Sequence, residues 1–266
     1  MADQKTKSLI TTCPFTVTSA DTDLMGRIRL GALANLLIQS AILSADRLGF
    51  GYRGLQRRQL FWVLIRLSLQ IDRPLWWYDQ VEVETWPKDI KGILYLRDFI
   101  LRDRDQRVVV RGTSGWLPLE RGSKRPRRLA GPDAEVFARL RDRHAISNPP
   151  VRLSPVKGGR YRTIPVRYYD IDLNQHVTST RYLDWMMNEF PADFHRQYYP
   201  RTLSVNYLKE TLPGETLRVI SRHQKDLEYV FQGNNLDREI PAFRGRICFA
   251  DGREDPPPCP QSSGVK

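Results

Sequence analysis

The sequence predicts an α+β protein built from two similar units, each with one strand, one helix and four further strands. A weak internal repeat supports this, because a short strand and an aspartate-rich turn precede a helical pattern in both halves. Each helical pattern is followed by segments rich in β-branched and aromatic residues, separated by turn residues. Two such copies describe a pair of α+β units in one chain.

The first copy opens with the strand Phe15-Thr-Val-Thr and the turn Asp21-Thr-Asp-Leu-Met-Gly26. A helix is predicted from Leu30 to about Leu48. Its segment Leu33–Leu43 is apolar almost all round, which is typical of a helix surrounded by other structure. The strands predicted after it are Phe61–Ile71, Gln80–Trp86, Ile93–Arg102 and Val108–Leu117.

The second copy opens with the strand Arg162–Arg167, and its helix is predicted from about Ser179 to Phe190. Apolar residues at helical spacing form one stripe on this helix, which indicates a face packed into the core; they are Tyr182, Leu183, Met186, Met187 and Phe190. The strands predicted after it are Leu203–Leu208, Glu215–His223, Glu228–Asn234 and Ile240–Phe249.

These patterns divide the chain into an N-terminal repeat over residues 1–131 and a C-terminal repeat over residues 161–250. Residues 132–160 form a predicted linker, with one short helix from Pro132 to about His144. Residues 251–266 contain three consecutive prolines and a Ser-Ser-Gly stretch, and they are predicted to be disordered.

The composition predicts a soluble, cytoplasmic protein. The chain has 266 residues, 41% of them hydrophobic, and no apolar run approaches the roughly 20 residues that span a bilayer. The first residues lack the apolar core of a signal peptide and are too few and too acidic before Phe15 for a transit peptide. The three cysteines are scattered and predict neither disulfides nor a metal site. No cofactor is expected.

The net charge of +12 calls for a partner or for a heavily solvated surface. The densest basic patch is Arg121–Arg128, which contains five Lys or Arg residues. Nucleic acid, an acidic protein and an anionic membrane would each complement such a charge. The sequence has no zinc-finger, helix-turn-helix or RNA-recognition signature, which argues against nucleic acid.

The most informative segment is Asp172-Leu-Asn-Gln-His176, where a carboxylate, a carboxamide and an imidazole alternate. In an extended segment these three side chains would lie on one side. A helix follows at once, and its first turn offers free backbone N–H groups. This arrangement could hold a carbonyl and activate a water molecule against it. The alternative is an Asx-rich turn that caps the helix.

Together with Arg181-Tyr182, Trp185 and Leu203–Glu210, this motif resembles the acyl-acyl carrier protein thioesterases of plants and bacteria, from about Phe15 to Phe249. The resemblance implies two tandem hot-dog repeats, each an antiparallel sheet wrapped around a long central helix. It also implies hydrolysis of a fatty-acyl thioester on the phosphopantetheine arm of acyl carrier protein. The family's catalytic positions fall on Asp172, Asn174, His176 and Glu210.

Two positions depart from the plant pattern. The residue after the strand glutamate, often a cysteine in plants, is Thr211, so a thiol nucleophile is not expected. The plant Asn-Asn pair after His-Val is replaced by Thr178-Ser179. No chloroplast transit sequence is recognised, which favours a bacterial-type enzyme.

For the chemistry, we expect Glu210 to act as general base for water with help from His176, and the helix N-terminus to bind the oxyanion. Asn174 would orient the water or the carbonyl, and Asp172 would fix the pose of its neighbours. How these four residues divide the work stays open, and attack by Asp172 or Glu210 through an anhydride is an alternative. In the first repeat neither Asn nor His follows Asp23, so this half is expected to house the acyl chain.

Acyl carrier protein is acidic as a class, so a basic surface would steer the encounter. The alternatives are a hot-dog thioesterase for acyl-CoA, a hot-dog enoyl hydratase, and a non-catalytic module that binds acyl chains or RNA. The sequence does not decide between a monomer and a homodimer, and it does not fix the preferred chain length.

Overall fold

The computed structural model describes residues 9–129 and 132–252. The first half contains β1 (Thr11–Thr16), η1 (Ser19–Asp21), α2 (Leu30–Arg47), α3 (Tyr52–Gln56), β2 (Leu60–Ile71), β3 (Gln80–Lys91), β4 (Leu94–Asp103) and β5 (Val108–Glu120). The second half contains β6 (Arg160–Pro165), η2 (Tyr168–Asp170), α5 (Ser179–Met187), α6 (Ala192–Gln197), β7 (Tyr198–Tyr207), β8 (Thr216–Lys225), β9 (Glu228–Asn235) and β10 (Ile240–Asp251). Between the halves lies α4 (Pro132–Val136).

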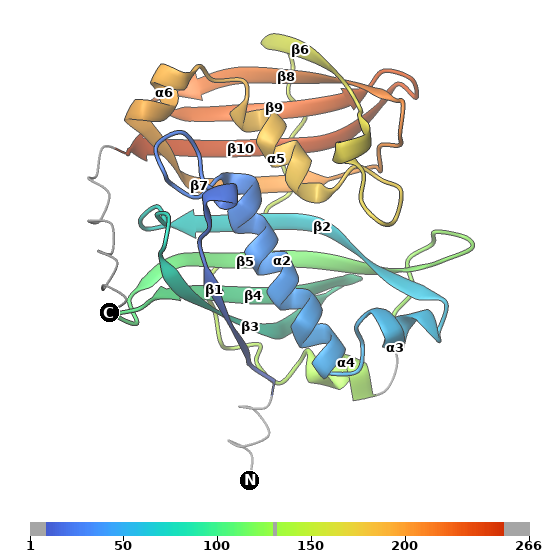
Figure 1. The fold of residues 1–266 in the computed structure, drawn as a ribbon. Coiled ribbons are helices and arrows are strands. Elements are labelled where there is room, and N and C mark those ends of the chain that lie inside the picture. Colours follow the sequence, from blue (N-terminus) through green and yellow to red (C-terminus); the bar gives the residue numbers. More distant parts are fainter. Residues whose placement is uncertain (1–8, 130–131, 253–266) are drawn as a thin grey trace, which may run out of the picture.

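All the strands form one antiparallel sheet with the order β1-β3-β4-β5-β2-β7-β10-β9-β8-β6 (Figure 1). Counted outward from the centre, the first half reads β2-β5-β4-β3-β1 and the second reads β7-β10-β9-β8-β6. The corresponding strands therefore occupy corresponding places. The halves join where β2 pairs with β7, from Arg66 opposite Asn206 to Gln70 opposite Thr202. The predicted α+β class is confirmed.

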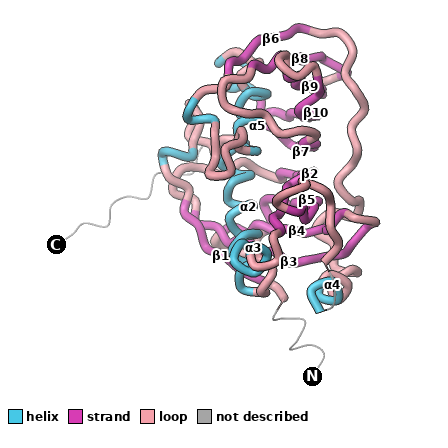
Figure 2. The backbone as a smooth tube through the Cα atoms, turned by 90° about the vertical axis from the view of Figure 1, so that its right-hand side faces the viewer, coloured by secondary structure: helices cyan, strands magenta, loops and turns pink. Residues whose placement is uncertain are grey.

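Both long helices cover the same face of the sheet (Figures 1 and 2). The main hydrophobic cluster includes Leu33 and Leu37 of α2, Met186 of α5, and Val205 and Phe243 of the sheet. Because these residues come from both halves, the two halves share one core. That core holds the start of α5, and with it the proposed site, in a fixed place on the sheet.

The connection between the halves crosses the opposite face of the sheet (Figure 2). Asn206 on β7 binds it twice: its Oδ1 accepts the Leu153 N–H at 2.7 Å and its Nδ2 donates to the Val151 carbonyl at 2.9 Å. Arg244 on β10 donates to the Leu153 carbonyl at 3.0 Å, and Gln232 on β9 accepts the Val156 N–H at 3.1 Å. The connection is therefore a strap bound by polar side chains of the sheet.

Five sequence predictions about elements need correction. The linker helix is shorter than predicted, since α4 spans only Pro132–Val136. After α4, backbone hydrogen bonds from an N–H to the carbonyl three residues earlier form turns instead of a helix. These turns place Phe137 and Leu140 in two separate hydrophobic clusters. The helix α2 is not surrounded, because one side faces solvent and leaves Ile42 42% and Leu43 54% exposed. A sheet on one side alone cannot cover the whole circumference of a helix.

The helix α5 ends at Met187 instead of Phe190, and α6 follows after Pro191. The strand β7 starts at Tyr198, five residues before the predicted start. Asp251, predicted to begin a disordered tail, lies in β10, whereas residues 253–266 of that tail lie outside the described residues. Among the described helices, none is both long enough and apolar enough to cross a membrane.

Candidate active site

The segment Asp172–His176 is a tight loop, not the extended segment that the alternating pattern predicted. The Asp172 N–H donates to the His176 carbonyl at 2.9 Å, and the Gln175 N–H donates to the Asp172 carbonyl at 2.9 Å. Ile171 and Val177 pair as an isolated bridge that closes the loop. Gln175 adopts a φ of 63°, in the left-handed region, to complete the turn.

The Asp172 carboxylate shapes this loop. Its Oδ1 accepts the backbone N–H of Asn174 at 2.8 Å, which is the bond of an Asx turn. The alternative interpretation of the motif as an Asx turn is therefore right about Asp172. Asn174 itself is exposed. A tight turn prevailed over an extended segment because a short aspartate side chain can satisfy a nearby N–H that would otherwise need a strand partner.

The buried Asp170 holds the loop against the start of α5. Its Oδ2 accepts the Arg167 N–H at 2.7 Å, and its carbonyl accepts the Thr178 N–H at 2.9 Å. Its Oδ1 accepts a bond from Nε of Arg181 at 2.9 Å. On the other side, the Val177 N–H donates to the Thr211 carbonyl at 2.9 Å. This last bond ties the loop to the chain just after β7, where Glu210 lies.

His176 and Glu210 meet as a result. The His176 Nε2 lies 3.1 Å from Oε2 of Glu210, and the two side chains are 25% and 30% exposed. The other oxygen, Oε1, contacts Nζ of Lys124 at 2.5 Å. Arg238 donates to the Glu210 carbonyl. Among the four predicted site residues, the side-chain contact is between these two, whereas Asp172 and Asn174 share the His176 loop through backbone bonds.

The charges around Glu210 set its ionisation. Burial alone would raise the pKa of Glu210, but the hydrogen bond from Lys124 and the charges of His176, Lys124 and Arg238 outweigh it. Together they hold the pKa of this carboxyl below its ordinary value. Glu210 is therefore a carboxylate at neutral pH.

Two tyrosines fix the start of α5 beside the pair. The Tyr182 hydroxyl donates to Oγ1 of the buried Thr211 at 3.0 Å, and the Tyr207 hydroxyl donates to the Ser179 carbonyl at 3.0 Å. Burial raises the pKa of Tyr182 to about 12, so this hydroxyl stays a neutral donor. The Arg181 N–H in the first turn of α5 donates to the Thr178 carbonyl at 3.0 Å, whereas the N–H groups of Ser179 and Thr180 precede the carbonyls of the helix and are its donors next to the His176 loop.

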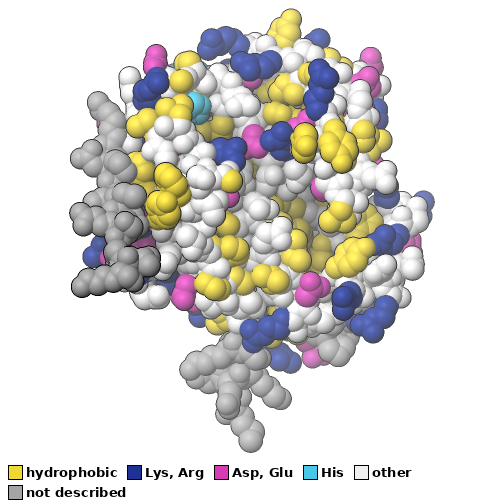
Figure 3. Space-filling view, in the orientation of Figure 1, with side chains coloured by type: hydrophobic (Ala, Val, Ile, Leu, Met, Phe, Trp, Pro, Cys, Tyr) yellow, Lys and Arg dark blue, Asp and Glu magenta, His cyan; other side chains and the backbone are white. Residues whose placement is uncertain are grey.

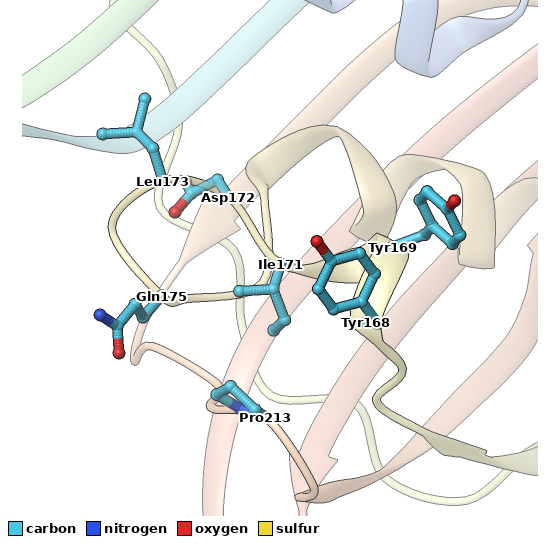
Figure 4. Close-up of a pocket in the computed structure, with 7 residues that line it drawn as sticks. All are labelled: Tyr168, Tyr169, Ile171, Asp172, Leu173, Gln175 and Pro213. Carbon is cyan, nitrogen blue, oxygen red and sulfur yellow. The ribbon is translucent and has the colours of Figure 1, made fainter.

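A surface pocket of about 600 Å³ adjoins the loop (Figure 4). It is lined by Tyr168, Tyr169, Ile171, Asp172, Leu173, Gln175 and Pro213. The two tyrosines are 86% and 87% exposed and stand on η2, on one side of the pocket (Figure 4). They and Lys124 are residues of this region that the sequence did not single out for the site. Among the described residues, no cluster of His, Cys, Asp or Glu could hold a metal ion.

The first half contains the same loop with different chemistry. The Asp23 N–H donates to the Arg27 carbonyl at 2.7 Å, the Gly26 N–H donates to the Asp23 carbonyl at 3.0 Å, and Oδ1 of Asp23 accepts the Met25 N–H at 2.8 Å. These are the bonds of the Asp172 loop, so Met25 corresponds to Asn174 and Arg27 to His176. The Ile28 N–H donates to the Leu75 carbonyl at 2.7 Å, as Val177 does to Thr211, and this places Pro74 where Glu210 stands.

The Arg27 side chain is fully buried in that place. Its Nε and Nη2 donate to Oδ2 of Asp23 at 3.2 and 3.0 Å, and its Nη1 donates to the Gly252 carbonyl at 3.3 Å. Nη2 also donates to the His195 carbonyl. The first half thus has a guanidinium and a proline where the second half has an imidazole and a carboxylate.

Known proteins show the family to which this chain belongs. Residues 9–136 match the model of the acyl-ACP thioesterase N-terminal domain, and residues 154–240 match that of the acyl-ACP thioesterase C-terminal domain. The chain is a member of the acyl-ACP thioesterase family. The first match runs from β1 through α4 and the second from the strap through β9, so nearly all of β10 and most of the strap lie outside the matched residues.

Two curated plant proteins are similar to this acyl-ACP thioesterase family member. Oleoyl-acyl carrier protein thioesterase 2 of Arabidopsis thaliana is 25% identical over 220 residues, which are 74% of this chain and 58% of the relative. Dodecanoyl-[acyl-carrier-protein] hydrolase of Cinnamomum camphora is 25% identical over 210 residues, 71% of this chain and 53% of the relative. The chain spans about half the length of the curated relatives it matches.

Solved structures share the fold of this family member. An acyl-ACP thioesterase from Bacteroides thetaiotaomicron superposes with a TM-score of 0.85 at 24% identity, over 92% of this chain and 99% of that one. The 12:0-ACP thioesterase from Umbellularia californica superposes with a TM-score of 0.80 at 19% identity, over 91% of this chain and 98% of that one. These likenesses extend to both halves of the sheet, because they cover nearly the whole chain.

Proposed function

We propose that this chain hydrolyses the thioester of fatty acyl-acyl carrier protein and releases the free fatty acid, which ends chain elongation. The observation that carries the proposal is the contact of 3.1 Å between His176 and Glu210 beside the start of α5, in a member of the acyl-ACP thioesterase family. A base next to free helix N–H groups is what thioester hydrolysis needs. The relatives are named as thioesterases or hydrolases of acyl carrier protein substrates.

Within this proposal, His176 is the general base and Glu210 orients it, the reverse of the roles expected from the sequence. A carboxylate with a lowered pKa is a weak base, and Glu210 is engaged through both oxygens. An ionised Glu210 accepts a hydrogen bond from the N–H at Nε2 of His176. This tautomer leaves the lone pair on Nδ1 free to accept a proton from a water molecule. Orientation of an imidazole by a carboxylate is a recurring device in hydrolases.

The reaction then proceeds in two proton transfers. His176 takes a proton from water while the water oxygen bonds to the thioester carbon, and N–H groups at the start of α5 stabilise the oxyanion. When the tetrahedral intermediate collapses, the carbon–sulfur bond breaks and the imidazolium returns its proton to the departing sulfur. The products are a fatty acid and a free thiol. Asp172 maintains the loop through its bond to the Asn174 N–H, and the Asn174 side chain orients the water or the carbonyl.

We interpret the two halves as tandem hot-dog repeats, in which the first houses the acyl chain and the second carries the chemistry. Their matching strand order supports this interpretation. The replacement of the catalytic positions by Arg27 and Pro74 also supports it, because the first half lacks a base at the corresponding place.

The partner that fits the charge is acyl carrier protein. The hairpin after β5 bears the basic patch Arg121–Arg128, which is exposed and reaches Glu210 through Lys124. Lys and Arg side chains are also scattered over the face seen in Figure 3, with hydrophobic side chains exposed between them. An acidic carrier would be attracted to this surface, so its turnover would weaken at high salt.

The test is thiol release from acyl-acyl carrier protein and acyl-CoA, with medium-chain to long-chain acyl groups. Wild type should prefer the carrier-bound substrates, and His176→Ala and Glu210→Gln should each lose roughly 10²-fold or more in kcat. The matched controls are His223→Ala and Glu82→Gln, an exposed histidine and an exposed glutamate on β8 and β3, which should retain wild-type turnover. If acyl-CoA is turned over as fast as the carrier-bound substrates, the alternative of an acyl-CoA thioesterase is favoured. No turnover of either substrate would overturn the proposal.

A further inference from the structure

The hairpin that follows β5 is fixed by its own hydrogen bonds. The Lys124 N–H donates to the Glu120 carbonyl at 2.9 Å, and the Glu120 N–H donates to the Arg125 carbonyl at 3.0 Å. The Ser123 hydroxyl donates to Oε2 of Glu120 at 2.6 Å. The hairpin backbone therefore has a defined shape.

Lys124 occupies the strained position of this hairpin. Its φ is 53°, in the left-handed region where glycine is the usual residue and a side chain costs free energy. Six other non-glycine residues of the described chain, Gln106 among them, also have a positive φ, so this φ alone assigns no role to Lys124. For Lys124 the interaction that the turn itself does not require is the one made by its ammonium group.

The Lys124 ammonium group belongs to the first half of the chain and contacts a carboxylate of the second half. Lys124 Nζ contacts Oε1 of Glu210, and Oε2 of the same carboxylate contacts Nε2 of His176. The carboxylate is thus held at two points, by a cation from the hairpin after β5 and by the imidazole of the loop before α5. Two contacts fix the rotation of the carboxylate about its own axis, which one contact would leave free.

We propose that Lys124 is a positioning residue for the catalytic pair, which turns the Glu210 carboxylate so that Oε2 faces His176. This inference rests on the proposed function, in which Glu210 orients the His176 imidazole. The contact that Lys124 makes is with Oε1 of Glu210, so its effect on His176 would pass through that carboxylate. The first half of the chain would then contribute one residue to chemistry performed in the second.

Charge supports the same role. The groups that face Glu210 are Lys124 from the hairpin, His176 from its loop, and Arg238 from the turn between β9 and β10. Burial raises the pKa of Glu210, and the hydrogen bond from Lys124 is foremost among the effects that lower it. Without Lys124 the pKa of Glu210 would rise, and the carboxylate would be lost at a higher pH as the solution is acidified.

The position of Lys124 allows a sharp experiment. In Lys124→Gly the backbone strain is relieved while the ammonium is removed, so the thermal midpoint should stay equal or rise although activity falls. With acyl-acyl carrier protein, we expect roughly tenfold lower kcat, little change in KM, and an acid limb of kcat that moves to higher pH. Lys124→Arg should restore most of the activity, because it returns a cation to Oε1.

The matched control is Gln106→Gly, a left-handed turn residue of the same half with a φ of 62°. It should have the same effect on stability as Lys124→Gly and leave the pH profile unchanged. A second measurement does not depend on turnover: the Glu210 carboxyl carbon is followed by NMR across pH, with its signal assigned by its loss in Glu210→Gln. The titration midpoint should move to higher pH in Lys124→Gly and not in Gln106→Gly.

Three results would overturn the inference. If Lys124→Gly lowers the thermal midpoint and leaves the titration midpoint of Glu210 unchanged, Lys124 stabilises the fold and does not position the carboxylate. A large rise in KM at wild-type kcat would make it a docking residue for the carrier. If wild type turns over no thioester, the proposed function fails, and an unmoved NMR titration would show separately that Lys124 does not govern Glu210.

Discussion

Arg27 stands in the first half where His176 stands in the second, and the carbonyl of each accepts the N–H of the aspartate four residues earlier, at 2.7 and 2.9 Å. The two loops share their backbone and differ in their side chains. The Arg27 guanidinium is buried and ion-paired with Asp23, whereas the His176 imidazole is partly exposed and faces a carboxylate. The same loop backbone thus carries a buried ion pair in the first half and, as we propose, a catalytic histidine in the second.

Arg27→Met should destabilise the protein by about 3 kcal/mol, because Oδ2 of Asp23 and the carbonyls of Gly252 and His195 would lose the guanidinium that donates to them. Urea unfolding measures the effect. The control Arg53→Met changes an exposed arginine of α3 and should cost little. A cost for Arg27→Met as small as that of the control would mean that this buried guanidinium does not hold the second half against the first.

Gln175→Gly should raise the free energy of unfolding by about 0.5 kcal/mol, because glycine adopts the left-handed φ of 63° without a steric cost. Gly26 holds the corresponding position of the first half, at a φ of 81°. The reverse change, Gly26→Ala, should cost about 1 kcal/mol although nothing lies within 4 Å of the added methyl. Thermal unfolding of both variants checks the pair, and effects of the same sign would contradict the correspondence of the two loops.

Gly31→Ala should destabilise the contact between α2 and α5 by about 2 kcal/mol. A Cβ at Gly31 would lie 2.4 Å from Oδ1 of Asp184 and 3.2 Å from the Thr180 carbonyl oxygen. The Asp184→Ala variant removes the nearer of these atoms, so Gly31→Ala should cost less in that background. A double-mutant cycle by urea unfolding measures this coupling. Strictly additive costs would show that the helices do not approach each other closely at Gly31.

Much of the fold could be predicted from residue patterns. The apolar period of Tyr182, Leu183 and Met186 marked the buried face of α5, and all three are buried. The strands were predictable because their β-branched and aromatic residues alternate between turn residues. The helix expected up to His144 was wrong because spacing alone could not tell that Phe137 and Leu140 pack in separate clusters.

Two features of the candidate site could not be predicted from sequence patterns: the geometry of the loop and the part played by Lys124. The Asp172–His176 motif singled out His176 and the family resemblance added Glu210, and the two meet at 3.1 Å. The extended geometry expected of the motif was wrong, since Asp172 forms a turn. Lys124 could not be found as part of this site. It lies 86 positions from Glu210 in the chain, and the two residues meet because both halves fold onto one sheet, in which β2 pairs with β7.

The most direct test of the proposed His176–Glu210 pair is turnover of acyl-acyl carrier protein by His176→Ala, Glu210→Gln and the double variant. Residues that act as a unit lose their function together. The double variant should therefore be no slower than the slower single variant. Losses that multiply in the double variant would show that the two residues act independently, and wild-type turnover by either single variant would remove that residue from the chemistry.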